Sequence, residues 1–332
     1  MRYVMKIAFF NTKSYDREIF ETTNHAFGHD IHFIEPHLNL VTAQLVQDEK
    51  CVCAFINDTL DRPVLELLKQ RGVELIALRS AGFNHVDLDA AKELGLVVVR
   101  VPAYSPYATA EYAVGLLMVM NRRLHRAFNR VREGDFSING LMGFDIHGKT
   151  VGVIGTGKIG QAFASIMVGF GSRVIAYDVY PSPECKAMGV EYVSLDELYA
   201  QSDIISLHCP LMESTQHIID AQAIAKMKTG VTILNTSRGR LLDTRAVIAG
   251  LKERKIGLIG LDVYEEEESM FFEDLSDDMI EDDVFARLLT FPNVMVTSHQ
   301  AFFTREAVAS IAESTLQNIR QYENKETLEN AI

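Results

Sequence analysis

Three glycines in the middle of the chain constrain its fold most strongly. Gly155, Gly157 and Gly160 form a G-x-G-x-x-G pattern that directly follows an apolar, strand-like run at 151–154 and opens an apolar helical stretch at 159–168. In that context the first glycine permits a tight turn and the second lets backbone N–H groups approach a pyrophosphate. The third lets the helix pack closely on the strand. The pattern therefore predicts a dinucleotide-binding βαβ unit.

The residue that ends the next strand-like run indicates which dinucleotide is bound. The run 173–177 is followed by Asp178, a carboxylate at the position expected to hydrogen-bond the ribose hydroxyls of NAD. The same carboxylate would repel the 2′-phosphate of NADP, and 179–181 contain no arginine to hold such a phosphate. We therefore expect NAD as the cofactor.

Strand-like and helical runs alternate along the rest of the chain. Such alternation predicts parallel sheets covered by helices, and 332 residues give room for about two domains. The fold class is therefore α/β, with two doubly wound parallel-sheet domains. Strands are expected at 4–10, 31–34, 51–56, 75–78, 97–101, 151–154, 173–177, 204–207, 231–234, 258–262 and 294–297, and helices at 62–70, 106–130, 159–168 and 304–322.

The charge balance and the apolar runs exclude several classes of protein. Forty-five acidic against 32 basic residues give a net charge of −13, which argues against a nucleic-acid or anionic-membrane binder. The longest uncharged apolar run, 112–120, is too short to span a membrane, and Lys6 interrupts the apolar N-terminus. We expect a cytoplasmic protein with no nucleic-acid or membrane partner.

Neither the cysteines nor the acidic residues form a recognisable metal or disulfide pattern. Cys51 and Cys53 alternate within a strand-like run, so small buried side chains are expected there, and Cys185 and Cys209 stand alone. The acid-rich segment 265–283 lacks the spacing of a calcium loop. We expect a solvated loop leading into a helix, and no metal site.

Three side chains that follow expected strands could act on a small keto acid. Arg238, Glu267 and His299 each lie beyond the C-terminal end of a strand, where open parallel sheets bind ligands. The planar guanidinium suits a carboxylate, and an imidazole beside a carboxylate can give and take a proton near neutral pH. His208 also ends a strand and is the rival histidine.

Taken together, these motifs resemble the D-isomer-specific 2-hydroxyacid dehydrogenases, and among them most the fermentative D-lactate dehydrogenases. The resemblance runs end to end. It rests on the glycine pattern and on four further segments: 235–239 (NTSRG), 262–265 (DVYE), 292–294 (PNV) and 299–301 (HQA), with 81–84, 101–106 and 271–274 as further matches. Ser298 stands where the family often has proline, and Arg240 where a small residue is common.

The resemblance implies a domain plan. A Rossmann NAD-binding domain at 103–302 would be inserted into a flavodoxin-like substrate domain formed by 1–102 and 303–332. The crossovers near 102 and 302 would act as hinges for a closure that expels water. Pairing of the cofactor domains through 106–148 would give a homodimer, or a tetramer made of two dimers.

The resemblance also implies a role for each site residue. Arg238 would hold the substrate carboxylate, His299 would be the acid/base group, and Glu267, five residues after Asp262, would pair with His299. Further substrate contacts would come from the N–H groups of Ala81 and Gly82, the hydroxyl of Tyr104 and the ring of Phe302. The implied cofactor-binding residues are Gly155, Gly157, Lys158, Ile159, Gly160, Asp178, Cys209, Pro210, Thr236, Ser237, Arg238 and Asp262.

The expected reaction is the reduction of pyruvate to D-lactate by NADH, slowing as pH rises, with the oxidation of lactate doing the reverse. A reductase of glyoxylate, hydroxypyruvate or larger 2-keto acids would share the same three residues and stays open. A formate dehydrogenase would carry glutamine in place of Glu267. A protein of another class, an NAD-sensing corepressor that binds peptides and turns over weakly, would share the fold.

Overall fold

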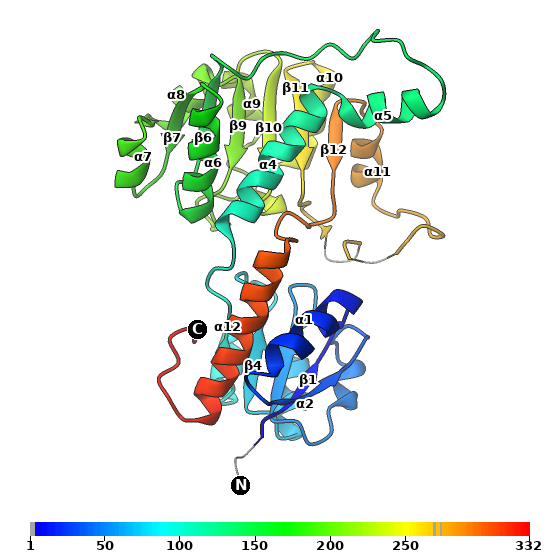
Figure 1. The fold of residues 1–332 in the computed structure, drawn as a ribbon, viewed down its shortest axis with the longest axis vertical. Coiled ribbons are helices and arrows are strands. Elements are labelled where there is room, and N and C mark those ends of the chain that lie inside the picture. The colour runs from blue at the N-terminus through cyan, green and yellow to red at the C-terminus, as the bar shows by residue number, and fades with distance from the viewer. Residues whose placement is uncertain (1–3, 268–269, 273) are drawn as a thin grey trace. The chain divides into compact units, whose positions relative to one another are not determined.

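The computed structural model describes residues 4–267, 270–272 and 274–332 and divides the chain into two compact units (Figure 1). Unit 1 comprises Met1–Ser105 and Phe303–Ile332, and unit 2 comprises Pro106–Phe302. Each unit is built around its own parallel sheet.

Unit 1 contains a five-stranded sheet in the order β2-β1-β3-β4-β5, with every pair parallel. This is the flavodoxin-like strand order. All residues of β3 and β4 are buried, as both faces of a helix-covered parallel sheet require. The elements are β1 (Lys6–Phe9), α1 (Ser14–Asn24), β2 (Asp30–Phe33), η1 (Thr42–Leu45), β3 (Cys51–Ala54), α2 (Arg62–Gln70), β4 (Leu75–Leu78), α3 (Leu88–Glu93), β5 (Val97–Val99) and α12 (Arg305–Glu323).

Unit 2 contains a seven-stranded parallel sheet in the order β12-β11-β10-β9-β6-β7-β8. The strand order reverses between β6 and β9, which creates the crevice where doubly wound sheets bind dinucleotides. The elements are α4 (Pro106–Asn121), α5 (Leu124–Arg132), β6 (Thr150–Ile154), α6 (Lys158–Gly169), β7 (Arg173–Tyr177), α7 (Pro183–Ala187), β8 (Glu191–Tyr192), α8 (Leu195–Gln201), β9 (Ile204–Leu207), α9 (Ala221–Lys226), β10 (Val231–Asn235), η2 (Gly239–Leu241), α10 (Thr244–Lys252), β11 (Ile256–Leu261), α11 (Asp283–Leu289) and β12 (Val294–Val296). The prediction of two doubly wound α/β domains is confirmed.

Local sequence signals set where several helices begin. Asp61 accepts a hydrogen bond from the Val64 N–H, and a proline occupies the first turn of α2. Ser194 and Glu197 cap α8 reciprocally. These caps satisfy N–H groups that have no acceptor within their own helix.

The single helix expected at 106–130 is wrong: α4 ends at Asn121 and α5 begins at Leu124. Arg123 between them has a φ of 51°, which interrupts the helical backbone. The side chain of Asn121 is buried and bonds both backbone groups of Phe144, at 2.7 and 2.9 Å. A contact with a distant segment therefore ends α4, and no glycine or proline marks the position.

Several strands also differ from expectation in extent, and β8 is not among the expected strands at all. β8 is two residues long and gives no hydrophobic pattern to detect. β5 ends at Val99 instead of residue 101, because the next N–H groups bond outside the sheet: the Arg100 N–H to Asn330 O and the Val101 N–H to Ser80 O, each at 3.1 Å.

All four cysteines are free and buried, as expected for Cys51 and Cys53. Burial raises the pKa of the Cys53 thiol to about 12 and that of Cys209 to about 11. Among the described residues, none of the helices combines the length and the apolar character that a membrane span requires, and no group of three or more His, Cys, Asp and Glu side chains is placed to hold a metal ion. Glu268 and Glu273 of the acidic segment lie outside the described residues.

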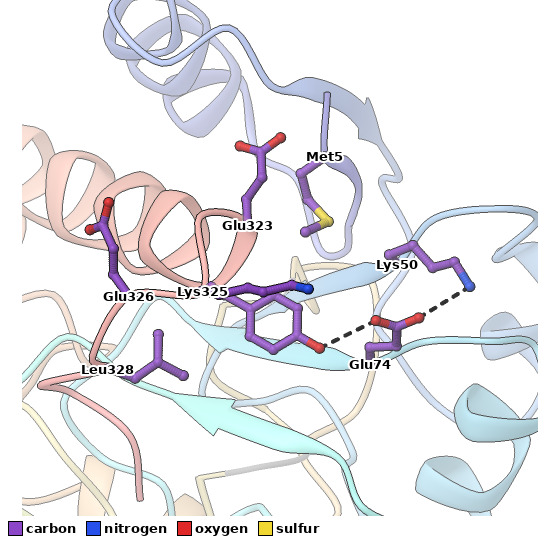
Figure 2. A pocket seen from close by; sticks show the side chains of 8 residues that line it. Met5, Lys50, Glu74, Glu323, Lys325, Glu326 and Leu328 are labelled. Carbon is purple, nitrogen blue, oxygen red and sulfur yellow. Dashed lines mark hydrogen bonds and ion pairs between the residues drawn. The ribbon is translucent and has the colours of Figure 1, made fainter. Parts of the chain in front are cut away.

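A pocket of about 590 Å³ opens at the N-terminal ends of the strands of unit 1 (Figure 2). Glu74 lies between Lys50, at 3.4 Å, and the hydroxyl of Tyr322, at 3.3 Å. Ligands of parallel sheets bind at the opposite, C-terminal ends of the strands, so this pocket is not at the end of the sheet where a substrate is expected. The pocket is lined by Met5, Lys50, Glu74, Tyr322, Glu323, Lys325, Glu326 and Leu328.

Candidate active site

The glycine loop between β6 and α6 has the three properties that a dinucleotide site needs. Gly155 has a φ of +94°, and a Cβ there would lie 2.5 Å from Cys209 N, so the loops after β6 and β9 touch. A Cβ at Gly160 would lie 2.0 Å from Gly155 O, whereas one at Gly157 would meet nothing within 4 Å. A tight turn, close helix packing and open space over the first N–H groups of α6 together fit a pyrophosphate.

Asp178 follows β7 and is tied to the same loop. Its Oδ2 accepts hydrogen bonds from the N–H and the hydroxyl of Thr156, at 2.5 and 3.0 Å, and its Oδ1 accepts from the Tyr180 N–H at 2.8 Å. Tyr192 donates to the Thr156 hydroxyl at 2.8 Å. The carboxylate is thus held beside the glycine loop, where ribose hydroxyls of a bound dinucleotide would be recognised.

Replacing Asp178 by asparagine is expected to raise the ratio of kcat/KM for NADPH to that for NADH about tenfold or more, because the charge that repels a 2′-phosphate is removed. Asparagine keeps an oxygen acceptor for Thr156, so the loop is retained. Steady-state kinetics with both cofactors measure the ratio, and Asp196→Asn, an exposed carboxylate of α8 that pairs only with Lys226 among the described residues, is the control. An unchanged ratio would contradict this role of Asp178.

The remaining cofactor-side residues also lie at the C-terminal ends of strands. Thr236 is buried, and its hydroxyl has no hydrogen-bond partner among the described residues. Lys158 and Pro210 are exposed, Ile159 and Ser237 are half-buried, and Cys209 is 7% exposed.

His208 is unsuited to proton transfer at neutral pH. Its side chain lies against Phe163, with ring centroids 4.8 Å apart, and Nε2 pairs with the Ser206 hydroxyl at 2.8 Å. Burial lowers the pKa of His208 to about 3, so the imidazole is neutral throughout the physiological range. This leaves His299 as the better acid/base candidate.

The loop after β10 fixes the backbone of Arg238. The Asn235 amide donates to Arg238 O at 2.8 Å and accepts from the Ser237 N–H at 3.0 Å, and the Ser237 hydroxyl donates to Cys209 O at 2.8 Å. A Cβ at Gly239 would lie 2.0 Å from the carbonyl of Tyr264, so the loops after β10 and β11 meet there.

The Arg238 guanidinium keeps most of its donors. One nitrogen donates to Ser237 O at 2.7 Å. Within residues 4–267, 270–272 and 274–332, no carboxylate lies within 4.0 Å of it. Its charge is therefore available to an anionic ligand.

His299 and Glu267 form a close pair in unit 2. The imidazole Nδ1 lies 2.6 Å from Glu267 Oε1, and the other carboxylate oxygen accepts the Tyr264 N–H at 2.8 Å. The two side chains are 15% and 18% exposed. Because Nδ1 faces the carboxylate, Nε2 is the nitrogen left for a substrate, and no described residue bonds to it.

The consecutive glutamates Glu265, Glu266 and Glu267 contact different partners. Glu265 bonds the imidazole of His217 at 2.7 Å and the Thr244 N–H at 2.9 Å, and Glu266 is exposed, 4.0 Å from Arg240. Arg240, for which the sequence offers no role, thus has a carboxylate neighbour, and its carbonyl accepts the His217 N–H. Only Glu267 reaches His299 among the glutamates that the structure describes.

Asp262 holds the loop that carries His299. The carboxylate is fully buried and accepts hydrogen bonds from the Thr297 hydroxyl at 2.6 Å, the Gln300 N–H at 3.0 Å and the Ala301 N–H at 2.7 Å. Its carbonyl accepts the His299 N–H at 2.7 Å. Burial raises the pKa of Asp262. This geometry supports a positioning role, which sequence reasoning missed; a contact with the cofactor stays a prediction.

The remaining expected substrate residues lie on other segments of the chain. Ala81 and Gly82 form a half-buried loop after β4, and Tyr104 lies just before the end of the first segment of unit 1. Phe302 is 9% exposed and ends unit 2.

Comparison with known proteins bears on this arrangement. Residues 114–301 match the family model described as "D-isomer specific 2-hydroxyacid dehydrogenase, NAD binding domain". The chain is 53% identical over 328 residues to the D-lactate dehydrogenase of Escherichia coli, covering 99% of this chain and 100% of that protein.

Two solved structures are similar over 99% of both chains. One is described as the pyruvate reductase of Chlamydomonas reinhardtii, with a TM-score of 0.95 and 44% identity. The other is a D-lactate dehydrogenase from Lactobacillus jensenii with NAD⁺, with a TM-score of 0.82 and 35% identity.

Proposed function

Because the chain belongs to the D-isomer-specific 2-hydroxyacid dehydrogenase family and is an NAD-dependent oxidoreductase, we propose that it is a D-lactate dehydrogenase that reduces pyruvate. The single observation that carries the proposal is the pairing of His299 with Glu267 at 2.6 Å in the unit that also presents Arg238 and the glycine loop. The full-length similarity to a D-lactate dehydrogenase supports the choice of substrate.

Each residue of the proposed mechanism has one task. Arg238 binds the carboxylate of pyruvate through its planar fork. His299 donates a proton from Nε2 to the keto oxygen, and Glu267 holds the imidazole in orientation and stabilises its charged form. When bound, the reduced cofactor NADH would supply the hydride in this direction, and NAD⁺ would accept it in the other. Because reduction consumes a proton carried by His299, it slows as pH rises, and lactate oxidation behaves oppositely.

Unit 1 contributes the remaining substrate contacts in this proposal. The N–H groups of Ala81 and Gly82 bind the carboxylate, and the Tyr104 hydroxyl adds a hydrogen bond. From unit 2, Phe302 packs near the substrate methyl group. Residues 1–102 with 303–332 serve as the substrate domain and 103–302 as the cofactor domain, and a cytoplasmic location stays a prediction from the sequence.

The first test mixes the purified protein with NADH and pyruvate, follows the loss of NADH absorbance and types the chirality of the product. Rapid turnover to D-lactate supports the proposal. Turnover of hydroxypyruvate, glyoxylate or a branched 2-keto acid with little of pyruvate favours the alternative reductases. Tight NADH binding without turnover of any 2-keto acid would instead favour the NAD-sensing corepressor.

A homodimer formed through the segment 106–148 is part of the proposal. Helix α5 buries none of its residues, and Phe128 on it is 63% exposed. In the segment that follows, Phe136, Ile138 and Met142 are 77%, 82% and 91% exposed. Apolar side chains this exposed are typical of a surface that a second subunit covers.

The double variant Phe136→Glu/Ile138→Glu is expected to raise the dimer dissociation constant about 100-fold or more, because two unpaired charges would have to be buried. Light scattering after size-exclusion chromatography at several concentrations measures the change. Met279→Glu, at an equally exposed apolar position elsewhere in unit 2, is the matched control. A double variant that stays as dimeric as the control would place the interface elsewhere.

A further inference from the structure

Three consecutive backbone carbonyls in the loop after β4 accept hydrogen bonds from donors of unit 1. Ser80 O accepts from the Val101 N–H at 3.1 Å, Ala81 O from Nη1 of Arg100 at 2.8 Å, and Gly82 O from the Ser80 hydroxyl at 2.8 Å. A surface loop usually leaves such carbonyls to water. Here protein donors fix the direction of all three carbonyls.

This bonding also directs the N–H groups of the loop. A trans peptide carries its carbonyl and the following N–H on opposite sides, so fixing Ala81 O turns the Gly82 N–H away from Arg100. Fixing Gly82 O does the same for the Phe83 N–H. In the part of the chain that the structure describes, the N–H groups of Ala81, Gly82 and Phe83 donate to no acceptor. Successive backbone N–H groups without an acceptor can bind an anion where a turn brings them together.

Both backbone groups of Arg100 are held by hydrogen bonds within unit 1. Its N–H donates to Asn330 O at 3.1 Å, and its carbonyl accepts from the amide of Asn318, a fully buried residue of α12, at 2.8 Å. The amide of Asn330 bonds the Asn318 side chain at 2.8 Å. The guanidinium lies over the ring of Phe83, 5.1 Å from the centroid. The donor therefore has little freedom to leave Ala81 O.

The positive charge of Arg100 is not neutralised nearby. No carboxylate of the described residues lies within 4.0 Å of the guanidinium. A charged donor on a carbonyl polarises the peptide and strengthens the N–H at its other end. The charge therefore acts on an anion bound at the Gly82 N–H through one intervening peptide.

We propose that Arg100 is a positioning residue for the substrate carboxylate: its guanidinium orients and polarises the Ala81–Gly82 peptide, whose N–H binds that group. The inference rests on the proposed function and adds to it a residue that does not itself touch the substrate. Sequence reasoning could have found it, because Arg100 directly follows a strand of a parallel sheet.

The test compares Arg100→Met, which removes both charge and donor, with Arg100→Lys, which keeps both in a less rigid form. For Arg100→Met, KM for pyruvate and the inhibition constant of oxamate, an anionic pyruvate analogue, should each rise about tenfold, with kcat changed less than about threefold. Arg100→Lys should recover most of the loss. NADH affinity and the unfolding temperature report on intact folding.

Arg71→Met is the matched control, because Arg71 also donates to a backbone carbonyl of unit 1, Val46 O, at 2.7 Å. It should leave KM for pyruvate unchanged. Pyruvamide, which lacks the carboxylate charge, distinguishes this role from a merely structural one. Its kcat/KM should fall less than about twofold in Arg100→Met, whereas general damage to the site would lower kcat/KM for both substrates alike.

Equal losses for pyruvate and pyruvamide, or an unchanged KM and oxamate inhibition constant in Arg100→Met, would overturn the inference. Failure of the proposed function is a distinct result, seen when the wild-type chain does not reduce pyruvate but reduces another 2-keto acid. The same comparison with that acid and its amide then tests Arg100.

Discussion

Replacing His299 by asparagine is expected to lower kcat for pyruvate reduction about a thousandfold, equivalent to about 4 kcal/mol in the activation free energy, because the proton donor is lost. Asparagine is the substitution that leaves the backbone undisturbed. His299 has a φ of +50°, a region that asparagine tolerates better than most residues. Loss of NADH absorbance measures kcat, and quenching of NADH fluorescence measures cofactor affinity, which should not change.

Replacing Glu267, the carboxylate paired with His299, should have a smaller effect on kcat. Glu267→Gln is expected to lower kcat about 10- to 100-fold, since the carboxylate that accepts the Nδ1 hydrogen bond and holds the imidazole in orientation is gone. Glu266→Gln changes the same chemical group one position earlier at an exposed site and should be neutral. A fully active Glu267→Gln variant whose reduction rate does not depend on pH would show that the pair does not act in catalysis.

The second large effect concerns the carboxylate of the substrate. Arg238→Gln is expected to lower kcat/KM for pyruvate about a thousandfold or more, because two charge-assisted hydrogen bonds are lost together. Arg238→Lys keeps the charge without the planar fork, so an intermediate loss of about 100-fold is expected. Steady-state kinetics with pyruvate at saturating NADH give the values.

The neighbouring arginine provides the control for this series. Arg240→Gln, two residues further on, removes an exposed guanidinium that lies 4.0 Å from the exposed carboxylate of Glu266, and should leave kcat/KM within about twofold. If Arg238→Gln behaved like Arg240→Gln, the carboxylate of the substrate would have to be bound elsewhere.

The sheets could be predicted from sequence because most of their strands are short and apolar, and the central ones are buried on both faces. The runs at 75–78, 173–177 and 204–207 coincide with β4, β7 and β9. Features set by distant contacts could not be found this way. The break after Asn121 depends on Phe144, and the end of β5 depends on hydrogen bonds from Arg100 and Val101 to Asn330 and Ser80.

For the candidate site, too, some residues could be predicted from the sequence and others could not. Arg238, His299 and Asp178 could be named because each lies within three residues of the end of a strand that the sequence reveals. Their supporting groups are invisible to such reasoning. The close approach of Gly239 to Tyr264 and the three bonds of Asp262 exist only once the loops after β10, β11 and β12 are brought together.

Spacing alone also leaves the choice among adjacent glutamates open. Glu265, Glu266 and Glu267 are chemically equivalent in the sequence, and resemblance to a family selected the third. In the structure the backbone turns so that Glu265 faces His217 while Glu267 faces His299. Side-chain direction within a loop is a property of its φ and ψ angles, which composition does not encode.

The four buried thiols make the native chain a ready background for site-specific labelling. Cys51, Cys53, Cys185 and Cys209 are at most 7% exposed, and a thiol reacts through its exposed thiolate form. Cysteines introduced at exposed positions such as Val41 in unit 1 and Met279 in unit 2 could therefore carry a fluorescent donor and acceptor while every native cysteine is kept. Energy transfer between the two dyes would then follow the expected hinge closure in real time during turnover.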